Sequence, residues 1–182
     1  MDRREFTKNI LATITSFALM DTLLSCNGFT SKVKPITKHW ALTLNEYCMD
    51  LKKESITVTE WQSKVEMLFE KIELKELLTF IDFNNLKKGF EFPDLGVNTK
   101  QIKFPTLTGL PEDTVFVKKL FGMKKDRAII PHGHINMSSA HLILQGEMHL
   151  RHYDKLFQEE QNLIIKPTID KIAKIGESSS IS

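Results

Sequence analysis

Hydrophobic positions in the first part of the chain recur with the period of an amphipathic helix. Trp40, Leu44, Tyr47 and Leu51 follow one another at spacings of four, three and four residues. That spacing places them on one helix face. The same period continues downstream through Trp61, Val65, Leu68, Ile72, Leu77, Leu78 and Ile81. Thr57 or Thr59 is suited to cap this second helical region. We predict helices whose aromatic and aliphatic stripes form core.

The pattern changes to short runs of β-forming residues after Pro111. Strands are predicted at residues 114–118, 127–131, 139–144, 148–153, 161–170 and 171–175. Residues 84–109 between the helices and these strands are rich in glycine and proline, which predicts an irregular segment. The predicted order is therefore helices first and antiparallel strands second.

The run from Ser139 to Gln145 predicts a strand with two different faces. Its apolar face carries Ala140, Leu142 and Leu144, and we expect it to pack against the N-terminal helices because alternate side chains of a strand share one face. The other face is mixed, which suits the lining of a small cavity.

Length and charge limit the function classes. The 182 residues suffice for one domain and a targeting segment. The formal net charge of +2 indicates neither nucleic acid nor a strongly acidic partner. Of the two cysteines, Cys48 lies in a predicted helix and is interpreted as an inert core thiol.

The N-terminus is interpreted as a targeting segment. Arg3 and Arg4 precede an apolar stretch at residues 10–24 that polar residues interrupt, so it is too short to span a membrane. This pattern resembles a twin-arginine export signal, and its end, Leu24-Ser25-Cys26, resembles a lipobox whose cysteine is lipidated. The alternative is an apolar helix with an incidental cysteine. We predict an exported protein, periplasmic or membrane-anchored through the lipid.

Four segments follow from these patterns. Residues 1–26 are the predicted signal with its lipobox, and residues 27–38 are a polar tether. Residues 39–110 form a helical cover with the irregular segment, and residues 111–182 form the predicted β domain.

Histidines gather in the β domain. On a strand, His132 and His134 would point to the same face, and His141 on the next strand could add a third imidazole. Imidazole nitrogens suit Fe, Zn, Cu or Ni. The alternative is a chance His-Gly-His sequence that binds no metal. We interpret His149 as a solvated side chain, while His152 shares a face with Met148 and Leu150 and points toward the interior.

The spacing of His132, His134 and Gly146 resembles the first metal-binding motif of the cupins. The resemblance covers residues 115–182 and departs from the motif at Ser139, which stands where cupins have a glutamate ligand. Thiol dioxygenases, which are cupin relatives, also lack that glutamate and hold Fe(II) with three histidines. The resemblance implies a mainly β fold with N-terminal helices, a cupin-type antiparallel β-barrel or jelly roll. Gly176 would open the second cupin motif, and the rest of that motif would fall beyond Ser182. The barrel is therefore expected to be incomplete at its C-terminal end.

The function implied by this resemblance is metal-dependent chemistry on a small organic molecule. More specifically, it implies an oxygenase that uses a divalent metal. Fe is the expected metal, and Zn, Cu or Ni are the alternatives. The alternatives are a non-catalytic envelope protein that binds a small ligand, and an inactive truncated remnant. Expected partners are a small molecule and the membrane through the lipid anchor, with no nucleic acid, and a homodimer is left open.

Overall fold

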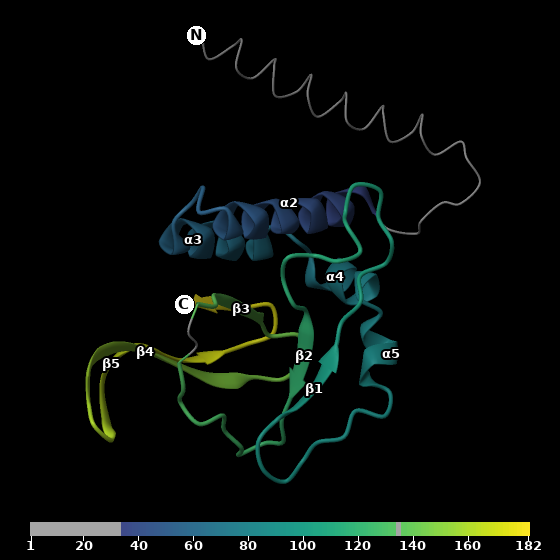
Figure 1. Ribbon diagram of the computed structural model, residues 1–182. Coiled ribbons are helices and arrows are strands. Elements are labelled where there is room, and N and C mark those ends of the chain that lie inside the picture. The colour runs from purple at the N-terminus through teal and green to yellow at the C-terminus, as the bar shows by residue number, and fades with distance from the viewer. Residues whose placement is uncertain (1–33, 134–135) are drawn as a thin grey trace, which may run out of the picture. The chain divides into compact units, whose positions relative to one another are not determined.

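The computed structural model describes residues 34–133 and 136–182, and residues 36–182 form one compact unit. The helices come first in the chain (Figure 1): α2 (Pro35–Lys52), α3 (Val58–Glu70), α4 (Leu74–Phe80) and α5 (Phe83–Lys87). The strands are β1 (Asn98–Gln101), β2 (Lys119–Gly122), β3 (Ser139–Leu142), β4 (Met148–Glu159), β5 (Asn162–Ala173) and β6 (Ser178–Ile181). The predicted order of helices before strands is confirmed, and α2 begins inside the segment predicted as a tether.

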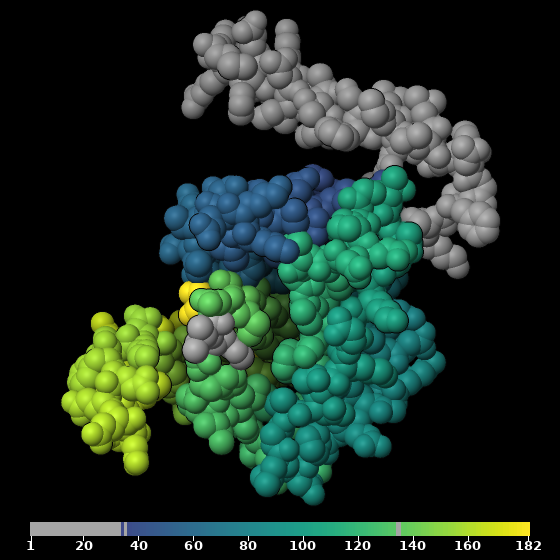
Figure 2. All heavy atoms as spheres, viewed as in Figure 1, coloured from purple at the N-terminus to yellow at the C-terminus, as the bar shows by residue number. Residues whose placement is uncertain are grey.

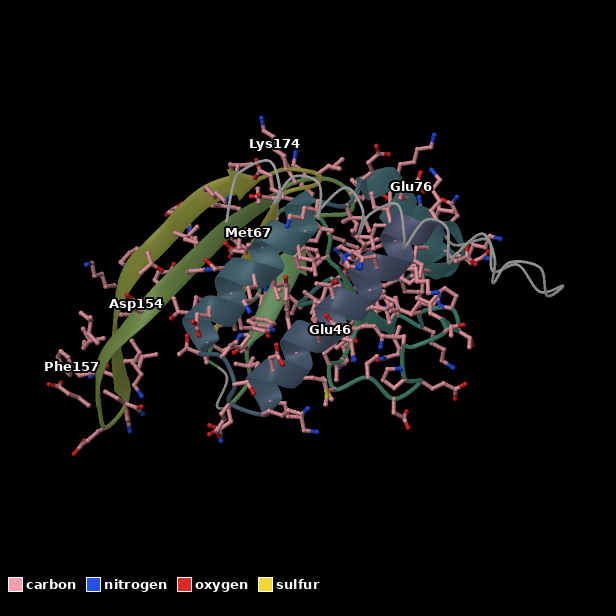
Figure 3. All side chains as sticks on the ribbon, turned by 90° about the horizontal axis from the view of Figure 1, so that it is seen from above. Glu46, Met67, Glu76, Asp154, Phe157 and Lys174 are labelled. Carbon is pink, nitrogen blue, oxygen red and sulfur yellow. The ribbon has the colours of Figure 1, made fainter. Side chains whose placement is uncertain are left out.

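Helices α2 and α3 lie side by side, and their apolar stripes form the core (Figures 1 and 3). The indole Nε1 of Trp40 donates a hydrogen bond to the backbone oxygen of Leu68 at 3.1 Å. Its ring centroid lies 5.8 Å from that of Phe69. The predicted stripes are buried at Trp40, Leu44, Trp61, Val65, Leu68, Ile72, Leu77 and Ile81. The prediction that these stripes form core is confirmed at these positions, whereas Tyr47, Leu51 and Leu78 are half-buried.

Of the two predicted caps, Thr57 and Thr59, it is Thr57 that caps α3. Its side chain accepts a hydrogen bond from the backbone N–H of Glu60, and the Glu60 carboxylate accepts one from the Thr57 backbone N–H. This reciprocal capping box satisfies two donors that a helix end otherwise leaves unpaired. It fixes where α3 begins and thus which of its residues face the strands.

Residues 139–181 fold back on themselves as one antiparallel ribbon with a break. Strand β3 pairs with β6, and β4 pairs with β5 in nearly the same register. The backbone N–H groups of Ile143 and Gly176 continue the ladder, bonding to Glu177 and Ile143 oxygens. Gly146 and Gly176 lie on opposite strands at the break, both with positive φ (76° and 86°), which glycine adopts without strain. The ribbon changes direction there, and α3 contacts β6 and β3.

The predicted cupin-type barrel is wrong. Within the described residues there are three antiparallel sheets of two strands each, β1–β2, β3–β6 and β4–β5, and they do not close. The cause is pairing within the ribbon. Strand β3 hydrogen-bonds to β6, and β4 hydrogen-bonds to β5. Further strands would be needed on its open edges to form a barrel.

Several element boundaries also differ from the prediction. Residues 114–118 and 127–131 form no strand, and Thr114 donates instead to the Phe116 backbone oxygen at 2.9 Å. Such a local side-chain bond competes with strand pairing. Strands β1, β2 and β6 were not predicted. The sequences of β1 and β6 are polar, and β2 begins one residue after the strand predicted at 114–118. The predicted strands at 161–170 and 171–175 are one strand, β5.

Candidate functional site

His132 lies in the exposed loop between β2 and β3. Its Nδ1 lies 2.8 Å from the backbone oxygen of Ile130. A histidine that donates from Nδ1 to a carbonyl carries its lone pair on Nε2, and metal-binding histidines are commonly oriented by such a bond. The sequence predicted that His132 lies on a strand. This prediction is wrong, because residues 127–133 form no strand.

The other two predicted ligands differ in how far the structure describes them. His134 lies outside the described residues. His141 is in β3, as predicted; its side chain is exposed, and it lies opposite Ser179 of β6. In the described part of the chain, no three His, Cys, Asp or Glu side chains are grouped so that they could hold a metal ion. The three-histidine site therefore stays a prediction.

A polar contact joins α3 to the C-terminal strand. One carboxylate oxygen of Glu66, Oε1, accepts hydrogen bonds from Ser180 N at 2.8 Å and from Ser180 Oγ at 2.6 Å. Ser180 and its neighbour Ser179 are only 7% and 5% exposed. Ala140 pairs with Ser180 across the β3–β6 ladder. The predicted packing of the Ala140 face against a helix is therefore confirmed by the contact of α3 with β3 and β6.

His152 belongs to the same buried region. It lies in β4 and is 8% exposed, on the strand face of Met148 and Leu150, which confirms its predicted inward orientation. Burial lowers the pKa of His152, the carboxylate of Glu66 raises it by less, and the ammonium of Lys171 lowers it further. The net effect favours the neutral imidazole. We name Glu66, His152 and Ser180 the buried polar cluster.

The lowered pKa of His152 predicts a loss of stability in mild acid. The unfolded chain takes up a proton at this residue near pH 6.5, whereas the folded protein does so at lower pH. Below pH 6.5 the unfolded state therefore binds more protons, so the free energy of unfolding falls as the pH falls. Urea unfolding between about pH 7.5 and about pH 5 measures this slope.

The variant His152→Gln removes the titrating ring and should remove this part of the slope. His39→Gln, on the exposed face of α2, is the matched control and should leave the slope intact. Asp170 and Glu60 also have lowered pKa values, but carboxylates act at more acidic pH. Equal slopes in the wild type and in His152→Gln would contradict the assignment.

His149 lies on the opposite face of β4 from His152 and contacts Asp170 of β5. His149 Nε2 is 2.5 Å from Asp170 Oδ1 on β5, and Arg151 Nε is 3.6 Å from Asp170 Oδ2. All three side chains are more than 40% exposed. A hydrogen bond to His149 lowers the pKa of Asp170. The interpretation of His149 as a solvated side chain is confirmed.

Lys118 and Cys48, two half-buried residues with nucleophilic side chains, are better explained by packing. The Lys118 ammonium lies 5.0 Å from the Phe104 ring centroid and 4.8 Å from that of Phe116, and it donates to Thr114 Oγ1 at 2.5 Å. Burial lowers the pKa of Lys118, yet two ring faces favour its charged form. For Cys48, burial raises the pKa of the thiol more than the Trp61 indole lowers it, which keeps the thiol protonated and inert.

The buried polar cluster was not predicted from the sequence. Glu66 is adjacent to the apolar stripe of α3 and gives no signal of its own, and Ser180 lies in a serine run that has low complexity. The two residues are 114 positions apart. Only the inward orientation of His152 could be inferred, from its alternation with Met148 and Leu150.

Comparison with known proteins gives no relative from which a function can be transferred. No protein-family model, curated protein or solved structure matches the chain. Arg3, Arg4 and Cys26, which carry the predicted export and lipidation signals, lie outside the described residues. Among the helices that the structure describes, none has the length and apolar character needed to cross a membrane.

Proposed function

We propose that the protein is an exported, lipid-anchored binding protein that holds a divalent metal through His132 and His134, with His141 as third ligand. The observation that carries this proposal is the orientation of His132: its Nδ1 is hydrogen-bonded to the Ile130 oxygen. That bond presents Nε2 as the coordinating nitrogen. Arg3, Arg4 and Cys26 support export and anchoring through their resemblance to a twin-arginine lipoprotein signal.

Binding is a better-supported function than oxygenase chemistry. The oxygenase interpretation came from the resemblance to cupins, whose barrel would surround the metal with a dry cavity. The described sheets are open, and His132 and His141 are both exposed. An exposed site of two or three imidazoles can bind Zn, Cu, Ni or Fe reversibly. We therefore assign the metal the role of bound ligand, exchanged at the envelope surface.

Loss of His132 and His134 is expected to abolish metal binding. Residues 27–182, purified and loaded with Zn, Cu, Ni or Fe(II), should retain close to one equivalent of at least one of these metals. His132→Ala and His134→Ala should each lower the affinity by at least about tenfold, because each removes one ligand, and the double variant should retain none. Elemental analysis and calorimetric titration measure this.

The matched control is His149→Ala, which removes an exposed histidine outside the loop and should leave the metal content unchanged. Retained binding in the double variant would contradict the proposal, as would a folded protein that takes up none of the four metals. His141→Ala tests the third ligand separately. Consumption of O2 by the Fe(II)-loaded protein with a small thiol would favour the oxygenase over the binding protein.

A further inference from the structure

Strand β6 lies at an edge of its sheet. Among the residues that the structure describes, β6 pairs with β3 alone, so its other side has no neighbouring strand. Such an edge presents backbone N–H and C=O groups to which a strand of another molecule can bond. Figure 2 shows the yellow atoms of the C-terminal end next to the blue atoms of α3, which contacts β6.

Two hydrogen bonds show which backbone groups of β6 point away from β3. In an antiparallel pair, both backbone groups of one residue point to the same side, and successive residues alternate. The Glu177 oxygen accepts from Ile143 N, so Glu177 points toward the β3 side, and Ser178 and Ser180 point the other way. Ser180 N agrees with this alternation, because it donates to Glu66 of α3. The open edge of β6 is therefore formed by Ser178 and Ser180.

Glu66 occupies one of the two pairing positions on that edge. Its Oε1 accepts from Ser180 N at 2.8 Å and from Ser180 Oγ at 2.6 Å. The Glu66 side chain is half-buried, so the contact lies at the boundary between the core and solvent. The four residues of β6 leave Ser178 as the other position on this edge. The short edge and the carboxylate bound to it both restrict strand addition.

A strand that paired with this edge would have to displace the Glu66 carboxylate. It would supply a neutral carbonyl oxygen to Ser180 N, and a charged acceptor makes the stronger hydrogen bond. The displaced carboxylate would also lose its bond from Ser180 Oγ and would lie close to the carbonyl oxygens of the added strand. Strand addition at β6 is therefore unfavourable while Glu66 is bound there.

We propose that Glu66 closes the β6 edge and so prevents self-association of the protein through that edge. This role is independent of metal binding, and it goes beyond fastening α3 to the ribbon. The two roles of Glu66 differ in their consequences. Loss of a fastening contact only lowers the stability of the fold, whereas loss of the edge protection leaves Ser180 N free to pair with a strand of a second copy.

Removal of the Glu66 acceptor tests the proposal. Residues 27–182 contain the whole compact unit, and sedimentation velocity from low to high micromolar concentration measures their self-association. Infrared spectroscopy of the amide I band detects strands that pair between molecules. Glu66→Ala and Glu66→Met should each self-associate at least about tenfold more strongly than the wild type. Glu66→Met keeps the length of the side chain, which preserves the packing of α3 if Glu66→Ala does not fold.

Two further variants separate edge pairing from a general loss of stability. Trp40→Ala removes core packing and leaves Glu66 in place, so its self-association should equal that of the wild type. Ser180→Pro removes the edge N–H, and proline is tolerated in an edge strand where the N–H points away from the partner strand. Added to Glu66→Ala or to Glu66→Met, it should restore the self-association of the wild type.

All comparisons are made at a temperature where circular dichroism shows the variants folded. Increased self-association in the Glu66 variants, reversed by Ser180→Pro and absent in Trp40→Ala, is the expected result. The proposal would be overturned by Glu66 variants that self-associate no more than the wild type. Association that persists after Ser180→Pro, or that is equally strong in Trp40→Ala, would overturn it too.

Discussion

Glu66→Ala is expected to lower the free energy of unfolding by about 3 kcal/mol. The substitution removes the acceptor of two hydrogen bonds, from Ser180 N at 2.8 Å and from Ser180 Oγ at 2.6 Å. Hydrogen bonds to a charged acceptor contribute more than neutral ones. Ser180 is 7% exposed, so its two donors would be left buried without their acceptor. The contact between α3 and β6 should weaken as a result.

Urea unfolding near neutral pH measures this loss. Glu70→Ala removes a carboxylate at the exposed C-terminal end of the same helix and should change the stability by less than about 0.5 kcal/mol. Glu66→Gln keeps an acceptor oxygen without the charge and should cost about 1 kcal/mol. If Glu66→Ala were no more destabilising than Glu70→Ala, the Glu66–Ser180 contact would not hold α3 against the ribbon.

Trp40→Ala is expected to lower the free energy of unfolding by about 4 kcal/mol. The indole is 5% exposed, packs against Phe69 and Phe104, and donates to the Leu68 backbone oxygen. Its removal leaves a large cavity between α2 and α3 and takes one of two donors from the Leu68 carbonyl, which still accepts from the Lys71 backbone N–H. The loss therefore falls on the packing that joins α2 to α3.

The measurement is again chemical denaturation, followed by far-ultraviolet circular dichroism because the substitution removes a fluorophore. Ile36→Ala is the matched control: it truncates an apolar side chain of the same helix that is 62% exposed. It should cost less than about 0.5 kcal/mol. A loss of similar size in both variants would mean that Trp40 is not the core residue that joins α2 to α3.

The helices could be predicted from the sequence because their information is local. The apolar spacing from Trp40 to Leu51 and from Trp61 to Ile72 predicts the buried faces, and Thr57 predicts a cap. The same holds for the alternation in β4, which correctly turned His152 inward and His149 outward. In each case the period of the element alone decides which side chains share a face.

The pairing of the strands could not be predicted from their composition. The spacing of His132, His134 and Gly146 led to a barrel, whereas the strands around them pair within one ribbon. The strand that completes this ribbon, β6, consists mainly of serines and has no β-forming signal. It is a strand because β3 supplies its hydrogen bonds and α3 covers it, and both are tertiary effects.

The sequence by itself determined the order of helices and strands, the buried faces of α2 and α3, and the orientation of side chains along β4, since each follows from the geometry of one element. It also led to the prediction that His132 and His134 bind a metal, which stays a prediction. Only the tertiary structure decided that the ribbon stays open, that Glu66 meets Ser180, and that the outer half of the β4–β5 ribbon exposes Phe157 and Leu163. These depend on contacts between residues far apart in the chain, and long-range contacts are fixed by packing of the whole fold, not by local propensity.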